Sequence, residues 1–215
     1  MVLHYVRLDS ILIEKGESDE GKEVLSMKTK VEAYYHSLYE VAAILNSAHA
    51  PKDILQSIVE NVAKTVGAKG CSLMLLTPDR KVLTHAASYG LSERYIKKGR
   101  VLADKSLSEA LAGRVVSVLH ASEDDRVQYP EQARKEGIAS MLSVPMVLRE
   151  EIVGVVRVYT GDPRQFTTND TYFVGAVANL GAIALENAKL YEALKKDYET
   201  FRREYFSSLG EERAW

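Results

Sequence analysis

The stretch GIASMLSVPMVLREEIVGVVRVYTGDPRQFTTND, residues 137–170, decides the fold of this chain. It contains two apolar runs rich in β-branched residues, 138–148 and 152–159, on either side of a short charged tip. Two such runs with a tip of this length predict a β-hairpin. The polar residues 167–170 are typical of a helix N-terminus, and apolar residues at helical spacing continue from there to about Phe206. The stretch therefore predicts a sheet hairpin that leads directly into a long helix.

The rest of the chain predicts helices and strands in a definite order. Apolar residues at an average spacing of 3.5 predict a helix from Val24 to Leu45, and Pro51 opens a second helix that Gly67 ends. The remaining predicted elements are strands over 71–76 and 82–88, short helices after Ser92 and over 106–112, a strand over 115–119 and a helix from Pro130 to Gly137. This order predicts an α+β domain built on an antiparallel sheet.

The composition excludes several classes of protein. With 215 residues, 46% of them apolar and 27% charged, the chain has the size and composition of one globular domain with extensions. A net charge of −2 without basic clusters argues against a nucleic-acid partner, and the apolar stretches are too short to cross a membrane. Cys71 is the single cysteine, and the first residues lack the pattern of a secretion signal. We therefore expect a cytoplasmic protein without internal disulfides.

Three segments resemble the C-terminal half of a GAF domain: G-I-x-S-x-L-S-V-P-M at 137–146, I-V-G-V-V-x-V-Y at 152–159 and F-T-x-x-D at 166–170. A weaker match reaches back to about Val31. GAF domains are small-molecule sensing and dimerising modules, usually without catalysis. The resemblance implies a GAF/PAS-like central antiparallel sheet of five or six strands, with the N- and C-terminal helices on one face and short helices and loops forming a pocket on the other. We accordingly divide the chain into an N-terminal extension (1–22), a GAF domain (23–190), and a protruding C-terminal helix and tail (191–215).

Arg157 interrupts an otherwise apolar face of the strand over 152–160. Side chains alternate along a strand, so Arg157 shares its face with Tyr159. An unpaired buried guanidinium is very costly. Its partner is therefore an anionic ligand or a carboxylate such as Asp124 or Asp125, unless the face is open to water. We predict Arg157 and Tyr159 to be ligand-binding residues.

The loop over 120–129 lies where the GAF family places its variable pocket-lining loop. Asp124, Asp125 and Tyr129 offer hydrogen-bond acceptors and an aromatic surface, which suit a purine-like or aromatic ligand. The alternative is a solvated loop with a capped turn. Both readings stay open at this point, and we include the three residues in the predicted ligand site.

Two further residues belong to the predicted ligand site. Ser140 and Ser143 lie three apart on a strand, so at most one of them points into a given pocket, and we select Ser143. His85 lies inside the strand over 82–88. It either reaches the pocket, where it would also suit a haem iron, or is an ordinary hydrogen-bonded strand histidine.

Residues for catalysis or metal binding are scarce. Phe166 and Asp170 match the N-K-F-D-E signature of cyclic-nucleotide-binding GAF domains, but Thr171 replaces its Glu and no Asn-Lys pair precedes it. GAF-like methionine sulfoxide reductases use several cysteines, whereas Cys71 is alone and opens an apolar strand. The histidines show no metal-ligand spacing, and no Gly-rich phosphate loop is present. We expect no enzyme activity, no metal site and an unidentified cofactor or ligand.

Two long apolar seams predict self-association. One lies in the helix over 24–48 and the other in the helix over 170–206, where positions from Phe173 to Tyr205 repeat at alternating spacings of 4 and 3. Beyond Tyr191 only the seam persists, so this part is expected to project from the domain as a coiled coil. The two helices pair either within one chain or, as we prefer, in the four-helix bundle of a parallel homodimer, with Asn187 setting the register.

The sequence thus predicts a non-catalytic, ligand-sensing and dimerisation module in signal transduction. It would bind an unidentified small molecule and relay this through its flanking helices to a separate output protein. The alternatives are a dimerisation scaffold with a vestigial pocket, a cyclic-nucleotide-binding domain and a methionine sulfoxide reductase.

Overall fold

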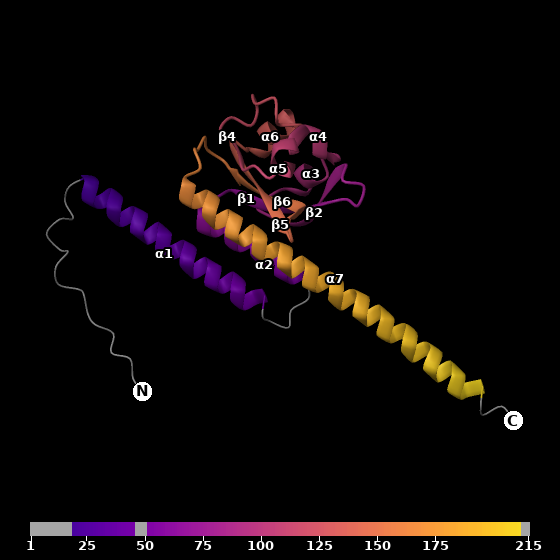
Figure 1. Ribbon diagram of the computed structural model, residues 1–215. Coiled ribbons are helices and arrows are strands. Elements are labelled where there is room, and N and C mark those ends of the chain that lie inside the picture. The colour runs from indigo at the N-terminus through magenta and orange to yellow at the C-terminus, as the bar shows by residue number, and fades with distance from the viewer. Residues whose placement is uncertain (1–18, 46–50, 212–215) are drawn as a thin grey trace, which may run out of the picture.

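A six-stranded antiparallel sheet in the order β3-β2-β1-β6-β5-β4 lies at the centre of the computed structural model (Figure 1). The structure describes residues 19–45 and 51–211. The strands are β1 (Gly70–Leu76), β2 (Val82–Tyr89), β3 (Val101–Leu102), β4 (Val116–Val118), β5 (Ser140–Leu148) and β6 (Glu151–Thr160). The predicted α+β class with an antiparallel sheet is confirmed.

The helices divide between the two faces of this sheet. Three long helices lie on one face: α1 (Asp19–Leu45), α2 (Pro51–Val66) and α7 (Thr168–Glu211). Helices α2 and α7 contact the strands, and α1 packs on α2 and α7. The other face, called here the inner face, carries α3 (Glu93–Ile96), α4 (Ala103–Ser106), α5 (Ser108–Leu111) and α6 (Pro130–Glu136). The predicted placement of the terminal helices is thereby confirmed.

Some boundaries differ from the predicted ones. The helix expected over 106–112 is split into α4 and α5, because Leu107 leaves the helical backbone with φ −140° and turns its side chain into the core. The two-residue strand β3 was not predicted. Helix α1 begins at Asp19, before the expected Val24. Residues 19–22 of the predicted N-terminal extension (1–22) therefore belong to α1. The rest of that predicted extension, 1–18, lies outside the described residues.

The hairpin of β5 and β6 has a tip of two residues rather than three. Arg149 and Glu150 both have positive φ angles, 47° and 70°, and Leu148 pairs with Glu151. A two-residue connection with both φ angles positive is the type I′ turn that suits the right-handed twist of a hairpin. Strand β6 pairs with β5 on one side and with β1 on the other, so it is central and has no free edge.

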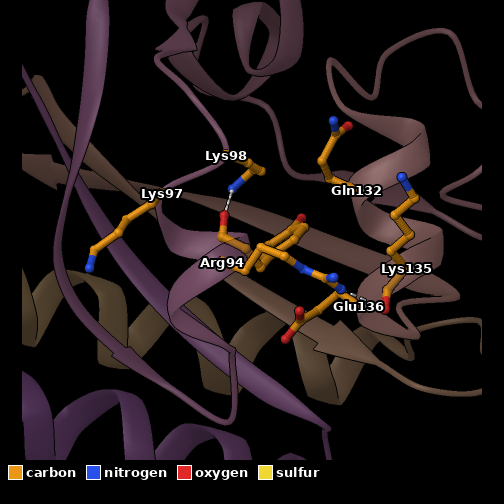
Figure 2. Close-up of a pocket in the computed structure, with 7 residues that line it drawn as sticks. Arg94, Lys97, Lys98, Gln132, Lys135 and Glu136 are labelled. Carbon is orange, nitrogen blue, oxygen red and sulfur yellow. Dashed lines mark hydrogen bonds between the residues drawn. The ribbon is translucent and has the colours of Figure 1, made fainter.

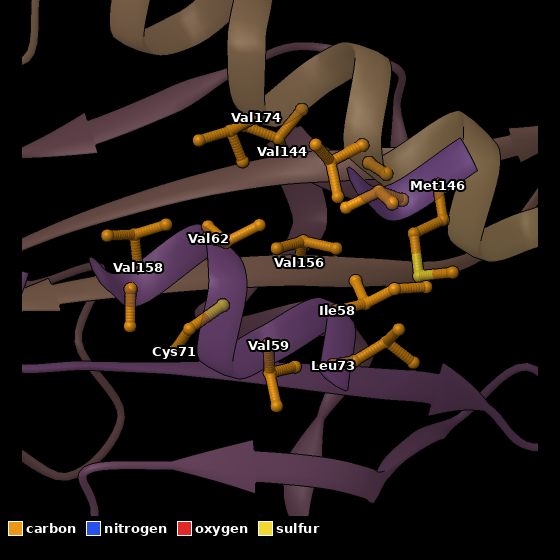
Figure 3. Packing of buried hydrophobic residues seen from close by; sticks show 14 of the residues in the cluster. Ile58, Val59, Val62, Cys71, Leu73, Val144, Met146, Val156, Val158 and Val174 are labelled. Atoms are coloured by element: carbon orange, nitrogen blue, oxygen red, sulfur yellow. The ribbon is translucent and has the colours of Figure 1, made fainter. Parts of the chain in front are cut away.

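Alternate residues of the central strands form an apolar core against the long helices. Val156 and Val158 of β6 lie in this core, with Ile58 and Val62 of α2 and Val174 of α7 (Figure 3). Each of these five side chains is fully buried. Burial of an aliphatic side chain contributes about 1.5 to 3 kcal/mol relative to exposure. This dry face fixes which side of the sheet can carry polar chemistry, because side chains alternate between the two faces.

Asp170 connects α7 to α1 and to the loop before α7. Its buried carboxylate accepts hydrogen bonds from Tyr34 Oη, from Arg164 at 2.7 Å and from both Thr167 N and Oγ1 at 2.8 Å, and Lys30 Nζ lies 3.2 Å away. Thr167 Oγ1 in turn accepts from Asp170 N, which makes a reciprocal capping pair. Burial alone would raise the pKa of Asp170, but these donors outweigh it and hold the pKa well below its usual range.

Asp170→Asn removes the charge that these donors share. We expect the free energy of unfolding, measured by urea denaturation, to fall by about 2 to 3 kcal/mol. Since the pKa of Asp170 is lower in the folded state than in the unfolded chain, its contribution is complete above about pH 5 and is lost as the pH falls. On acidification, the free energy of unfolding should therefore fall less in the variant than in the wild type, because the variant has no carboxylate at position 170 to protonate. Asp162→Asn, which changes an exposed carboxylate in the same loop, is the control, and an equal loss in both variants would contradict this role.

Candidate ligand-binding site

A row of polar residues crosses the inner face of the sheet. Ser72 of β1 pairs with Arg157 of β6, and Arg157 pairs with Ser143 of β5. The three side chains lie in register on neighbouring strands. Buried apolar residues of the same face, among them Met74 and Val155, surround this row. Polar groups in such surroundings must find hydrogen-bond partners, so their arrangement is informative.

Arg157 is buried, with 7% of its surface exposed. Its Nε donates to Ser143 Oγ at 2.8 Å. The alternative of an arginine at an open face is therefore wrong. Asp124 and Asp125 are both described, and neither forms an ion pair with Arg157, so the suggested pairing with these carboxylates is absent.

Tyr159 lies two residues further along β6 on the same face. Its Oη and Ser72 Oγ are 2.9 Å apart, and its ring contacts that of Tyr95 edge to face, with 5.9 Å between centroids. Burial raises the pKa of Tyr159, an effect that the neighbouring Arg157 partly offsets. The phenol is therefore neutral and serves as a hydrogen-bonding group.

A β-bulge lies directly beside His85. Leu73 pairs with Ala87 and Met74 with His85, so Ala86 is the extra residue on β2. Both ring nitrogens of His85 are buried and have no hydrogen-bond partner. Burial, followed by the charges of Lys98 and Arg157, lowers the pKa of His85 to about 4, so the imidazole is neutral at pH 7.

Lys98 follows α3 and extends over the inner face. Its Nζ donates to the carbonyl oxygen of Tyr95 at 3.1 Å and lies 3.8 Å from the centroid of the Tyr95 ring. Burial and the charge of Arg157 lower the pKa of Lys98 to about 8, although Glu136 acts in the opposite direction. The ammonium therefore loses its proton far more readily than an exposed lysine.

A cavity of about 300 Å³ opens beside Lys98, between α3 and α6 (Figure 2). Its lining carries four cationic side chains, one carboxylate, one amide and one phenol: Arg94, Lys97, Lys98, Lys135, Glu136, Gln132 and Tyr95. The Glu136 carboxylate accepts from both the backbone N and Oγ of Ser92, the residue that caps α3. The cavity is thus strongly positive, with Lys98 at the boundary to the inner-face row.

The structure brings four of the predicted site residues together, namely Arg157, Tyr159, Ser143 and His85. All four lie on the inner face, on β2, β6 and β5, with β1 between β2 and β6. Arg157 is near enough to lower the pKa of His85 and to counteract the rise in the pKa of Tyr159 that burial causes.

The predicted loop residues lie elsewhere. Asp124 is held by Arg126, whose Nη2 also donates to the carbonyl oxygen of Ser117 in the edge strand β4. Asp125 is exposed. Neither is part of the inner-face row, and this arrangement agrees with the alternative of a solvated loop with a capped turn.

Tyr129 stands between the loop and the cavity. Its Oη donates to the carbonyl oxygen of Arg100 at 2.8 Å, and its ring centroid lies 5.9 Å from Lys98 Nζ. Gly99 makes this approach possible, because a Cβ there would lie 2.6 Å from Tyr129 Oη. Gly99 also has φ +136°, which a residue with a side chain rarely adopts.

Sequence reasoning missed Ser72, Tyr95 and Lys98. Ser72 is a polar residue in the apolar run 71–76, the same signal that identified Arg157. The chain as a whole has no basic cluster, yet three of the four residues 97–100 are cations, a local signal that sequence reasoning passed over. No pattern indicated that Lys98 would be half-buried, because that depends on the packing of α3 over the sheet.

Cys71 is on the opposite face. It lies in the apolar core with Val59 and Val62, is fully buried, and burial raises the pKa of its thiol. A thiolate is the reactive form of cysteine, so this residue has neither the position nor the ionisation of a nucleophile.

The sequence profile of the GAF domain matches residues 48–186. The chain belongs to the GAF domain family, as the residues in the hairpin and the following helix predicted. Members of this family are signalling and sensing modules. No curated protein sequence matches the chain.

Solved structures of the same fold include three with different roles. A GAF domain from a phosphoenolpyruvate-protein phosphotransferase of Coxiella burnetii is 17% identical, with a TM-score of 0.67 over 76% of this chain and 98% of that one. A free methionine-R-sulfoxide reductase of Neisseria meningitidis is 16% identical, with a TM-score of 0.63 over 75% and 93%. A domain of a putative two-component sensor histidine kinase of Sinorhizobium meliloti is 14% identical, with a TM-score of 0.58 over 69% and 99%. Identities this low establish the fold alone.

Two further findings concern only the described part of the chain. None of its helices is both long and apolar enough to span a membrane. Within the same residues, no group of three or more histidine, cysteine, aspartate or glutamate side chains is placed to hold a metal ion.

The pKa of His85 can be measured by NMR titration of its ring protons, and we expect a value of about 4. Burial is the main cause and the charge of Lys98 the second, so Lys98→Met should raise the pKa but leave it below about 6.5. His85→Gln identifies the signal by its disappearance. An unchanged pKa in Lys98→Met would show that the ammonium does not act on the imidazole.

Proposed function

We propose that the chain is a non-catalytic, ligand-sensing and dimerisation module of signal transduction that works in the cytoplasm. The observation that carries this proposal is His85, whose two buried ring nitrogens lack partners beside Arg157 and Lys98. An unsatisfied buried donor or acceptor costs about 1 to 3 kcal/mol. A ligand that completes the hydrogen bonds of the imidazole accounts for this arrangement, whereas folding alone gives no reason for it.

The contacts of the inner face support binding rather than catalysis. A nucleophilic serine needs a base within hydrogen-bond reach. Ser72 is instead bonded to Tyr159 and Ser143 to Arg157. Among the described residues, neither serine is bonded to His85, and Cys71 lies on the other face.

A dimerisation scaffold with a vestigial pocket is the second candidate. The side chains of Met74, Met141 and Tyr159 are almost completely buried and occupy much of the inner face. This filling favours a module that has closed its own pocket. The two candidates differ in whether the purified protein holds a small molecule.

Native mass spectrometry of gently purified protein tests the ligand. We expect a retained small molecule in the wild type and its loss in Arg157→Ala, because the variant removes the buried charge of the polar row. Arg157→Lys keeps the charge without the planar fork and should retain less ligand than the wild type. Arg114→Ala, which truncates an arginine side chain that is 64% exposed, is the control. Wild-type protein without any bound molecule would contradict ligand sensing and favour the scaffold.

The relay depends on α7, whose two parts differ in burial. Phe173 and Val177, at the start of the seam, are buried, and the Phe173 ring stacks on Tyr34 of α1 with 4.7 Å between centroids. This part of the seam pairs within the chain. Further along, Tyr191, Leu194, Tyr198, Phe201 and Tyr205 are all at least half exposed. Here α7 extends beyond the sheet (Figure 1).

The exposed part of α7 suits a second copy of the chain. Its seam keeps the spacing of a coiled coil, and the flanking residues carry opposite charges on its two sides. Asp197 and Glu204 occupy one flank, and Lys195 and Arg202 the other. In a parallel homodimer, Asp197 faces Arg202 of the second copy. In an antiparallel homodimer, like charges would meet. We therefore infer a parallel pair that transmits its geometry to a separate output protein.

Sedimentation velocity tests the dimer. Leu194 is 69% exposed, so Leu194→Glu leaves the fold of the protomer intact. We expect it to raise the dimer dissociation constant at least about a hundredfold, because two charges would then meet in the seam. Lys196→Glu, on the outer side of the same helix, is the control. A wild-type monomer at micromolar concentration would overturn the proposal.

Charge reversal tests the orientation. Asp197→Arg and Arg202→Asp should each weaken a parallel dimer, and the double variant should restore it, because only the combination re-forms opposite charges. The same sedimentation measurement reads both effects. Single variants that strengthen the dimer would instead indicate an antiparallel pair.

A further inference from the structure

The cavity between α3 and α6 has an excess of positive charge that the fold does not need. Arg94, Lys97, Lys98 and Lys135 line it, against the single carboxylate of Glu136 (Figure 2). Among these cations, Lys97 is paired with Glu93 of α3 at 2.8 Å. Glu136 is engaged by Ser92 at the start of α3. Like charges gathered around one cavity oppose folding, and a bound anion would reverse that effect.

Lys98 has no anionic partner of its own. Its ammonium contacts the Tyr95 carbonyl and the faces of two tyrosine rings, and none of the described carboxylates forms an ion pair with it. It is also the residue that links the cavity to the inner-face row. Lys98 lines the cavity, and its ammonium is also near enough to His85 on the sheet to lower the pKa of the imidazole.

His85 of β2 does not line the cavity but lies near enough to Lys98 for the charge of the ammonium to lower its pKa. A neutral imidazole presents one N–H donor and one acceptor nitrogen, and here both lack a partner. The groups that face Lys98 are Tyr95 of α3, Tyr129, Glu136 of α6, His85 of β2 and Arg157 of β6. The charges of Arg157 and Glu136 oppose each other, so the excess of positive charge comes from Lys98 and the rim cations.

We propose that this cavity binds a small phosphomonoester dianion, with the phosphate held by Lys98 and the rim cations. This inference rests on the proposed ligand-sensing function and names its ligand class. With Lys97 paired to Glu93 and Glu136 in the lining, the four cations keep an excess of two positive charges, which a doubly charged group matches better than a single carboxylate does. Arg94 adds a guanidinium, which suits phosphate oxygens. A volume of about 300 Å³ fits a small molecule rather than a peptide or lipid surface.

Binding of a dianion should be accompanied by proton uptake at Lys98. With a pKa of about 8, roughly half of the free sites lack this proton at pH 8. An adjacent dianion favours the ammonium and raises its pKa, so binding restores the proton. Phosphomonoesters have a second pKa of about 6, and the ligand itself hardly titrates in this range. Affinity should therefore fall as the pH rises from 7 to 9, by about tenfold.

Isothermal titration calorimetry of the full chain tests this with glycerol 2-phosphate as the probe and malate as the dicarboxylate comparison. Titrations at pH 8 in two buffers of different ionisation enthalpy measure the protons taken up, and we expect about half a proton per site. Lys98→Met should abolish binding. Lys98→Arg should bind with no proton uptake and little pH dependence, because a guanidinium stays charged. Lys189→Met, an exposed lysine of α7, is the control and should match the wild type.

The outcomes separate this inference from the proposed function. No binding of the probe up to about 10 mM, or tighter binding of malate, would overturn the phosphate assignment. Binding without proton uptake, or with the same pH dependence in Lys98→Arg, would overturn the role of Lys98. Suppose that the calorimetry shows no binding of the probe. If native mass spectrometry still shows a retained molecule in the wild type, ligand sensing stands and only this inference fails. If it shows none, both fail.

Discussion

The alternation of side chains along β6 is the constraint on which the rest of the structure depends. This strand is bonded on both sides, so its backbone groups are satisfied and only its side chains can differ between the two faces. Val156 and Val158 supply the dry side against the long helices, and Arg157 and Tyr159 supply the polar side. A shift of one residue would place the guanidinium in the aliphatic core. The register of the sheet and the chemistry of the inner face are therefore fixed by the same few residues.

The two faces also explain which features could be predicted from the sequence. The hairpin, the long helix and the class of fold follow from periodicity and turn residues, which are local. Arg157 could be identified because it breaks an apolar pattern within one strand. His85 and Ser143 were chosen as polar residues within predicted strands, and their place on the inner face depends on strand pairing and on the β-bulge beside His85, which the sequence does not show.

The remaining parts of the site depend on distant packing. Lys98 becomes half-buried only because the segment after α3 lies over the sheet, and Tyr129 reaches it only beside a glycine. Asp124 was a reasonable choice by composition, but Arg126, two residues away, engages its carboxylate. The split between α4 and α5 likewise follows from the burial of Leu107, a tertiary effect that outweighs local helix preference.

A continuous set of hydrogen bonds joins the sheet to the base of α7. Ser140 Oγ of β5 donates to the carbonyl oxygen of Leu119 and accepts from Arg164 N, and Arg164 also reaches Val66 and Asp170. Asp170 continues the set to Tyr34 in α1. The first turn of α7 is thus held by polar contacts to both layers. At 1.5 Å per residue, the 44 residues of α7 span roughly 66 Å, and about half of this length, from Tyr191 onward, extends beyond the sheet. The length of this segment amplifies small movements at its base. A tilt of about 10° where α7 leaves the sheet would move the end of the helix by about 5 Å, roughly the rise of one helical turn.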